Sequence, residues 1–285
     1  MKVHDIYIKQ AADSENLKCE FKSLVKDANL RRRMCRLSKI GVHTALECLQ
    51  YGTGCIDKID AIITATGYGF LSNSENFLED LIQNQEKFAN PTCFIYSTFN
   101  TLGFQIAQLL SNHCYNTTHT HREYSFESAL LDGIMQLSSD KSKNVLVGAF
   151  EETTPTEIKI LKRLGMSVSA MPAERATFFV LGNDPENALA EIKSLEFNVE
   201  WSEKDEWLDA LNSKHNNYSL YCNGELYDQK LKQGKKNYYC PVYSAYALWT
   251  ILKRSTKTGT SVICTKHPGM NGTSIEIEVL RVNDH

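Results

Sequence analysis

Residues 125–152 read SFESALLDGIMQLSSDKSKNVLVGAFEE and contain two elements of different periodicity. The first part places apolar or small residues three and four positions apart, which is the spacing of a helix with one buried face: Phe126, Ala129, Leu130, Gly133, Ile134 and Leu137. The second part, 144–150, is a continuous apolar run around one glycine, typical of a strand buried on both faces. A helix that leads into such a strand indicates an α/β protein.

The rest of the chain continues this alternation of helices and strands. Helical spacing predicts helices over 33–50, 74–86, 102–110, 155–164 and 245–252. Short apolar runs predict strands over 60–66, 93–96, 175–181 and 218–222, whereas 116–121 alternates polar residues and has little apolar content. The more polar stretch 183–216 is expected to be a connecting segment, with helices near 184–191 and 203–212. Strands over 260–264 and 274–282 are expected to close the chain as a hairpin, in an α/β fold whose sheets are covered by helices.

Composition limits the class of protein. The chain has 285 residues, 42% hydrophobic and 23% charged, so it can bury a core without a metal or disulfide staple. Its net charge of −3 argues against a broad nucleic-acid-binding face. Nine scattered cysteines without C-x2-C spacing predict free, mostly buried thiols in a reducing compartment. No apolar run has the length of a signal peptide or membrane span, so we expect a cytoplasmic protein.

Common cofactor and hydrolase motifs are absent from the sequence. It contains no G-x-x-x-x-G-K-[ST] loop, no complete G-x-G-x-x-G and no G-x-S-x-G. Gly67-Tyr68-Gly69 lacks the third glycine and is interpreted as a tight turn. We therefore predict no cofactor.

Histidine and arginine clusters are the remaining candidates for binding sites in this sequence. His119 and His121 would share one face of a strand close to His113, but a metal site needs three or four convergent ligands, so we predict no metal. The basic run at 31–33, followed by Arg36, is interpreted as a solvated helix start that contacts an anion locally, in preference to a nucleic-acid site.

Five segments follow one another in an informative order: Arg32–Arg36, Thr66–Leu71, Asn90–Thr101, Ser125–Leu130 and Val145–Glu152. Their order and spacing resemble those of β-ketoacyl synthases, and most narrowly the ketosynthase-like proteins of aryl polyene and flexirubin pigment synthesis. The resemblance covers 30–165 and, more weakly, 218–282. It implies a thiolase-like layered fold, with an N-terminal half over 1–165 and a shortened C-terminal half over 166–285.

The resemblance also locates three catalytic positions, none of which holds the residue that condensation requires. The family's nucleophilic cysteine lies seven residues past an asparagine that matches Asn116, and this count reaches Glu123. The first catalytic histidine is replaced by Asn223 and the second by Pro241. A carboxyl group cannot hold an acyl chain as a thioester, and without imidazoles the decarboxylating groups are also missing.

These replacements imply a non-condensing subunit that resembles a chain-length factor and is not itself an enzyme. Such a subunit pairs with an active ketosynthase, or with itself, and works with an acyl carrier protein in fatty acid or polyene-type synthesis. An alternative is a malonyl-acyl-carrier-protein decarboxylase that uses Glu123, since some relatives carry glutamine at the cysteine position. A third possibility is a scaffold that only docks the carrier protein.

Two further segments receive roles through the resemblance. The family pairs its subunits through the strand that matches Thr117, Thr118, His119, Thr120 and His121, and the weakly apolar character of this segment suits an interface. The flexible loop beside the family's active site matches Gly269, Asn271 and Gly272. Glycine there would equally serve an ordinary hairpin turn.

Overall fold

The computed structural model of this chain describes residues 3–50, 58–87, 91–139, 144–165, 174–199, 213, 218–222, 225–226, 242–254, 259–266 and 273–281. Its strands are β1 (Tyr7–Asp13), β2 (Ala61–Ala65), β3 (Tyr115–His119), β4 (Asn144–Glu152), β5 (Glu174–Gly182), β6 (Ala190–Val199), β7 (Tyr218–Cys222), β8 (Glu225–Leu226), β9 (Thr260–Lys266) and β10 (Thr273–Arg281). Its α-helices are α1 (Phe21–Leu24), α2 (Ala28–Arg33), α3 (Arg36–Gln50), α4 (Leu71–Gln83), α5 (Pro91–Ile95), α6 (Thr101–Leu109), α7 (Ser125–Ser138), α8 (Pro155–Arg163) and α10 (Tyr243–Arg254). Short 3-10 turns are η1 (Ser14–Asn16) and η2 (Arg122–Tyr124).

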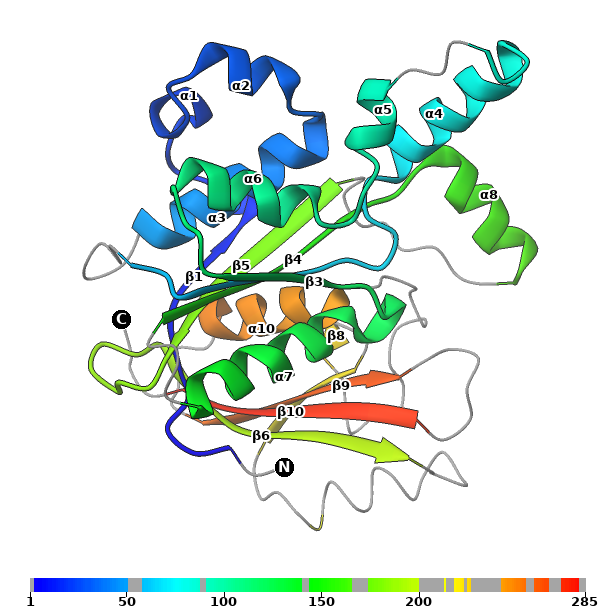
Figure 1. Ribbon diagram of the computed structural model, residues 1–285. Helices are drawn as coiled ribbons and strands as arrows, with labels where there is room; N and C mark the ends of the chain where they lie inside the picture. The colour runs from blue at the N-terminus through cyan, green and yellow to red at the C-terminus, as the bar shows by residue number, and fades with distance from the viewer. Residues whose placement is uncertain are drawn as a thin grey trace.

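The described strands form one sheet in the order β3-β2-β4-β5-β1-β6-β10-β9-β7-β8. In its first part, β2 runs parallel to β3 and β4, whereas β5 is antiparallel to β4 and β1. The joint between β1 and β6 consists of only two residue pairs, Tyr7 with Glu191 and Ile8 with Ala190. This narrow joint divides the sheet into a first part from β3 to β1 and a second part from β6 to β8 (Figure 1).

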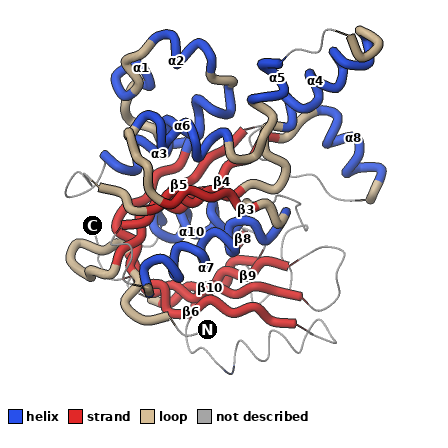
Figure 2. Tube along the Cα trace, in the orientation of Figure 1, coloured by secondary structure: helices blue, strands red, loops and turns tan. Residues whose placement is uncertain are grey.

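Helices and the two parts of the sheet alternate as layers. Helices α3 and α6 cover one side of the first part, while α7 and α10 lie between the first and second parts (Figures 1 and 2). The two faces of the first part accordingly enter separate cores. Ile62, Leu146 and Phe178 pack with α3 and α6, whereas Ile63 and Val147 pack with α7. This alternation explains the continuous apolar sequence of β2 and β4, because both faces of each strand are covered.

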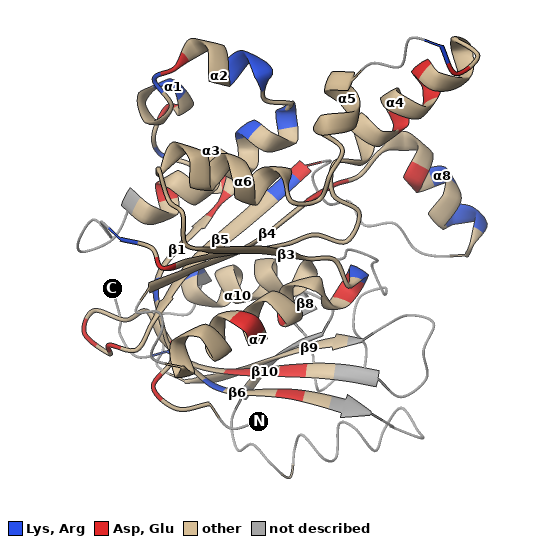
Figure 3. Ribbon diagram, in the orientation of Figure 1, with Lys and Arg blue, Asp and Glu red and all other residues tan. Residues whose placement is uncertain are grey.

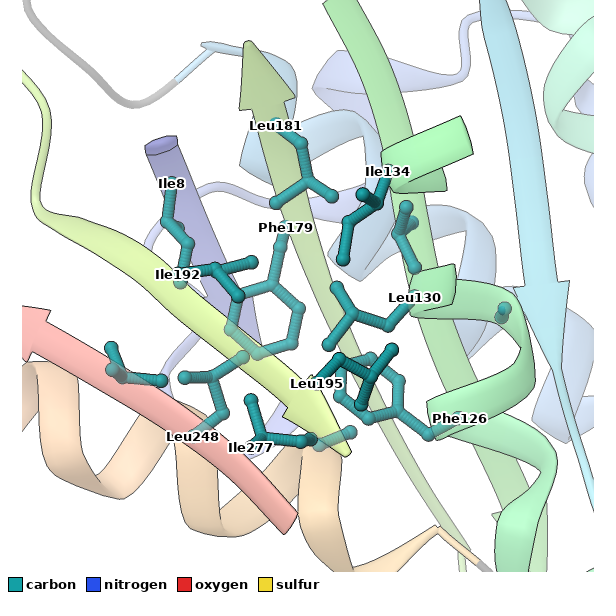
Figure 4. Packing of buried hydrophobic residues seen from close by; sticks show 14 of the residues in the cluster. Ile8, Phe126, Leu130, Ile134, Phe179, Leu181, Ile192, Leu195, Leu248 and Ile277 are labelled. Atoms are coloured by element: carbon teal, nitrogen blue, oxygen red, sulfur yellow. The ribbon is translucent and has the colours of Figure 1, made fainter. Parts of the chain in front are cut away.

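The larger core fills the space around α7 and α10 (Figure 4). The ring of Phe126, in the first turn of α7, lies 5.7 Å from the ring of Phe179 of β5. The glycine within the β4 run is required by packing on the opposite face, since a Cβ atom at Gly148 would lie 2.0 Å from Phe178 Cδ1. Close packing of this kind fixes the register of the first sheet part.

Most expected elements are confirmed to within a few residues, and so is the α/β fold class with helices on the sheet. The closing strands β9 and β10 are antiparallel neighbours, as the expected hairpin requires. Strand β1 is not among the expected strands, and it forms the inner edge of the first sheet part. The proposed division at residue 165 stays a prediction, although β5, which follows that point, belongs to the first sheet part.

Three expectations were wrong. The strand expected over 93–96 is helix α5, because Pro91 provides a favourable first helical residue and the run lacks strand neighbours. The helix expected near 184–191 is a turn followed by β6, because the positive φ of Asn187 (56°) is incompatible with a right-handed helix. Of the six described free cysteines only Cys48 and Cys264 are buried, so these thiols are not mostly buried. The helix expected over 203–212 lies outside the described residues.

Candidate functional site

The carboxyl ends of the parallel strands β2, β3 and β4 meet the start of α7, and this edge is the candidate site. Glu123 lies in the 3-10 turn η2 immediately before α7 and is 6% exposed. Arg122 beside it has a positive φ of 50°. Ser125 Oγ anchors the turn by donating to Thr66 O at 2.9 Å, at the end of β2. The turn therefore presents Glu123 at a helix N-terminus, the place where the fold would activate a nucleophile.

A second acidic residue lies one helical turn further along α7. Glu127 is fully buried, and its Oε1 accepts a hydrogen bond from Thr265 Oγ1 of β9 at 2.5 Å. Burial, with a smaller contribution from the nearby Glu123, raises the pKa of Glu127 to about 7 against the lowering effect of the Thr265 hydrogen bond. The start of α7 thus brings two carboxyl groups into one buried region.

A third acidic residue, Glu151 near the end of β4, holds the turn that follows β2. Its carboxyl oxygens accept hydrogen bonds from Gly67 N at 2.6 Å, from Tyr68 N at 3.2 Å and from Thr66 Oγ1 at 3.3 Å. Burial raises the pKa of Glu151 to about 8. Gly69 completes the turn with a φ of 66°, a conformation that favours glycine. Gly67-Tyr68-Gly69 is therefore a tight turn, as expected, and Glu151 fixes it.

An ion-pair cluster lies across the same edge of the sheet. Arg175 of β5 contacts Asp13 of β1 through two nitrogens, Nη2 to Oδ1 at 3.0 Å and Nε to Oδ2 at 3.2 Å. Thr177 Oγ1 also donates to Asp13 Oδ2. The Arg175 guanidinium lies 3.5 Å from the ring centre of Tyr246, so the cluster also holds α10 against the first sheet part.

The two expected strand histidines lie beside α7 rather than in a metal site. His119 Nε2 is 3.0 Å from Asp132 Oδ2, and His121 Nδ1 is 2.9 Å from Ser128 Oγ. Tyr115 Oη donates to the same Asp132 oxygen at 3.0 Å. Within the described part of the chain, no three histidine, cysteine or acidic residues converge as metal ligands.

Several predicted site residues lie outside the described residues: Asn223, Pro241, Gly269, Asn271 and Gly272. Elements that flank them are described, however. Strand β7 ends at Cys222 beside Cys264 of β9, and α10 begins at Tyr243. The assignment of these residues to the histidine positions and the glycine loop, like that of Glu123 to the cysteine position, stays a prediction.

Sequence reasoning missed Glu127, Glu151 and the Asp13–Arg175 pair. A signal for Glu151 was present, because an acidic residue directly after a doubly buried strand is unusual unless it binds backbone donors. Glu127 likewise interrupts an apolar helix face. The pairing of Asp13 with Arg175 has no local signal, since 162 residues separate them.

Comparison with solved structures defines the class of this layered α/β protein. It superimposes on "the ishigamide ketosynthase/chain length factor" with a TM-score of 0.71 and 12% identity, over 97% of this chain and 99% of that one. It also matches a type II polyketide ketosynthase complex, AntDE:AntF (TM-score 0.70, 15% identity, 99% and 100% covered), and the ApeO ketosynthase–ApeC chain length factor complex of Xenorhabdus doucetiae (0.59, 15%, 99% and 100%). At these identities the matches show the fold, which is thiolase-like as expected.

The family follows from the sequence. The chain belongs to the β-ketoacyl synthase family, because the model described as "Beta-ketoacyl synthase, N-terminal domain" matches residues 10–222. Among curated proteins, none matches the chain. Within the described residues, no helix has the length and apolar character needed to cross a membrane.

Proposed function

We propose that this chain is a non-condensing ketosynthase-like subunit, similar to a chain-length factor, that pairs with an active ketosynthase in cytoplasmic fatty acid or polyene-type synthesis. The observation that carries the proposal is the buried carboxyl group of Glu123 at the N-terminus of α7. In a β-ketoacyl synthase this position calls for a thiolate, and a carboxyl group there leaves no stable acyl carrier. The partner would supply the cysteine, and this chain would help to shape the acyl pocket.

The edge of the sheet at β3 supports a partner. Among the described strands β3 pairs only with β2, so its other side is open. Large apolar side chains are exposed around it: Phe104 of α6 is 60% exposed, Tyr115 of β3 45% and Met135 of α7 59%. An open strand edge with exposed apolar neighbours is a feature that soluble proteins normally cover. A ketosynthase, or a second copy of this chain, would cover it.

A basic surface supports the proposed acyl-carrier-protein partner. Residues 18–39 include eight Lys or Arg and two acidic residues, in a chain whose net charge is −3. Most of these cations lie on α1, α2 and the start of α3, at the top of the molecule in Figure 3. Arg32 and Arg33 are exposed. Such a patch would attract an acidic helical protein more strongly than a neutral one.

Reversing the charge of Arg32 and Arg33 together to glutamate should weaken carrier-protein binding by about 10-fold or more, because two attractive pairs become repulsive. Titration calorimetry at two salt concentrations would measure the loss and its dependence on ionic strength. The same charge reversal at the exposed Lys162 and Arg163 of α8 is the matched control. Equal losses in both variants would mean that binding depends only on net charge.

Malonyl-carrier-protein decarboxylation is the alternative that the buried acids keep open. Glu123 would have to accept the malonyl group beside a second carboxyl group, Glu127, and their negative charge opposes this unless a proton is bound. A pure docking scaffold is the third candidate, and nothing specific in the site favours it. We therefore rank both below the pocket-shaping subunit.

Carbon dioxide release from malonyl-acyl-carrier protein tests the choice directly. We expect the purified chain to release no more than the background amount, and Glu123→Ala and Glu123→Gln to behave alike, since no thiol or imidazole activates the thioester. Mass spectrometry of the same mixtures should find no acyl group on any cysteine. Turnover that Glu123→Ala abolishes would assign the chain to the decarboxylases instead, and acylation of a cysteine would overturn the proposed degenerate site.

A further inference from the structure

Glu127 is a buried acid for which neither the fold nor the proposed pairing accounts. It lies in the first turn of α7 with no solvent exposure, inside the layer between the two sheet parts. The residues around it on α7, Phe126, Ala129 and Leu130, belong to the larger apolar core. An acid in such a position costs stability, and an apolar residue would pack there without this cost. Its presence therefore calls for a functional reason.

Glu127 lies where three segments of the site meet. Oε1 accepts a hydrogen bond from Thr265 Oγ1 of β9 at 2.5 Å. The Ser244 hydroxyl of α10 lowers the pKa of the carboxyl group slightly, although it makes no hydrogen bond within the described residues. Oε2 is buried and has no hydrogen-bond partner among the described residues. An unpaired oxygen is far less costly on a neutral carboxylic acid than on a carboxylate, because only the charged form loses strong hydration on burial.

The three segments are those that border the predicted catalytic positions. Helix α7 begins beside Glu123, β9 ends next to the segment that holds Gly269 and Gly272, and α10 begins two residues after Pro241. The hydrogen bond between Glu127, in the first turn of α7, and Thr265, near the end of β9, therefore fixes the distance between these two segments. Glu127 therefore contributes by positioning its neighbours and not by reacting with a substrate.

We propose that Glu127 is a positioning residue that, with its carboxyl group protonated, holds the end of β9 against α7 through Thr265. The effect of this residue on function rests on the proposed function, because the segments that Glu127 fixes would shape an acyl pocket shared with a ketosynthase. Loss of the proton would place a second negative charge beside Glu123 inside the apolar layer. This cost exceeds the gain from a stronger Thr265 hydrogen bond, because burial raises the pKa more than that bond lowers it, so α7 and β9 would loosen.

The groups that face Glu127 favour its protonated form and include few other titratable side chains. Glu123, on the turn before α7, is the charged group that acts on it, and its effect favours the protonated form. The residues that β2 and β4 turn toward α7 are apolar, including Ile63 and Val147. β3 contributes His119, which is paired with Asp132, while β9 and α10 contribute the hydroxyls already named.

The sign of the pH dependence follows from the raised pKa. The carboxyl group binds its proton more tightly in the folded chain (about 7) than in the unfolded chain (4.5). Its contribution to stability is therefore fully present below pH 4.5 and is lost as the pH rises through about 7. Glu127→Gln keeps an acceptor for Thr265 but cannot ionise, so it should remove this dependence.

The test uses hydrogen exchange and infrared spectroscopy on the isolated chain. In the wild type, corrected amide exchange in 260–265 should accelerate by up to about 10-fold between pH 6 and pH 8, because most of the proton is lost over this interval. Glu127→Gln should show no such acceleration and should lose one neutral-carboxyl infrared band. Glu157→Gln is the matched control, since Glu157 is also buried with a pKa raised by burial to about 7, but lies on α8.

A reconstituted ketosynthase complex supplies the functional readout. Glu127→Gln should bind the ketosynthase as the wild type does and should shift the distribution of product chain lengths, whereas Glu157→Gln should not. An unchanged infrared spectrum, or pH-independent exchange in the wild type, would overturn the proposal. If the wild type binds no ketosynthase, the proposed function fails, and the two measurements on the isolated chain still decide whether Glu127 carries the proton and holds β9.

Discussion

Thr118→Pro is expected to weaken binding to the ketosynthase by at least about 100-fold, the size of an interface hot spot. Thr66 N donates to His119 O at 3.1 Å, so the backbone of residue 119 faces β2. Backbone groups alternate along a strand, and Thr118 therefore directs its N–H and C=O to the open side of β3. Proline removes that N–H and its ring blocks a neighbouring strand, while the ladder with β2 remains.

The control for this substitution is Thr118→Val. Both variants lose the 2.7 Å hydrogen bond between the hydroxyls of Thr118 and Thr64, so only proline changes the outer edge. Sedimentation of the chain with and without a purified ketosynthase would measure both binding and self-association. Met135→Glu, on the exposed part of α7, should weaken the same complex independently. Wild-type affinity in the proline variant would show that the partner does not bind at β3.

The helices and strands that were predicted correctly are those whose hydrophobic pattern follows directly from which of their faces are buried. Strands β2 and β4 are covered on both faces, so residues 61–65 and 145–150 are apolar or glycine except for the buried Thr64. Strand β1 was not predicted because it has no continuous apolar run. Lys9 and Gln10 interrupt its apolar residues, although Gln10 is buried. Its place is set by pairing with β5, a contact across about 170 residues that local periodicity does not contain.

The mistaken strand at 93–96 shows where local composition misleads. Cys93, Phe94 and Ile95 have the residue types of a strand, but Pro91 begins a helix and the described strands leave no neighbour for this segment. Phe94 and Ile95 are instead 55% and 59% exposed on α5. Their apolar character therefore reflects the surface of the molecule and not its core.

The candidate site was only partly predictable for the same physical reason. The position of Glu123 before a helix follows from the sequence, because the apolar stripe that begins at Phe126 marks where α7 starts. The partners of Glu127 and Glu151 come from β9 and from the turn after β2, far away in the sequence. Only the assembled sheet brings these groups together, so the chemistry of the edge becomes visible with the fold.

Arg175→Leu should lower the free energy of unfolding by about 3–5 kcal/mol, the typical effect of leaving a buried charge unpaired. Asp13 is 1% exposed and Arg175 4% exposed, so water cannot replace the lost guanidinium. The variant also removes the contact that holds Tyr246, and with it α10, to the first sheet part. Urea denaturation followed by circular dichroism would measure the change, provided that the transition stays two-state.

Two comparisons separate the unpaired charge from the loss of packing. The first comparison is an exposed ion pair: Arg36 lies 2.5 Å from Glu174, but its side chain is 82% exposed. Arg36→Leu should therefore lower the free energy of unfolding by less than about 1 kcal/mol. Asp13→Asn in the Arg175→Leu background removes the orphaned charge and should restore much of the lost stability. If the double variant is no more stable than Arg175→Leu alone, the cost lies in the Tyr246 contact and the cluster acts by packing α10.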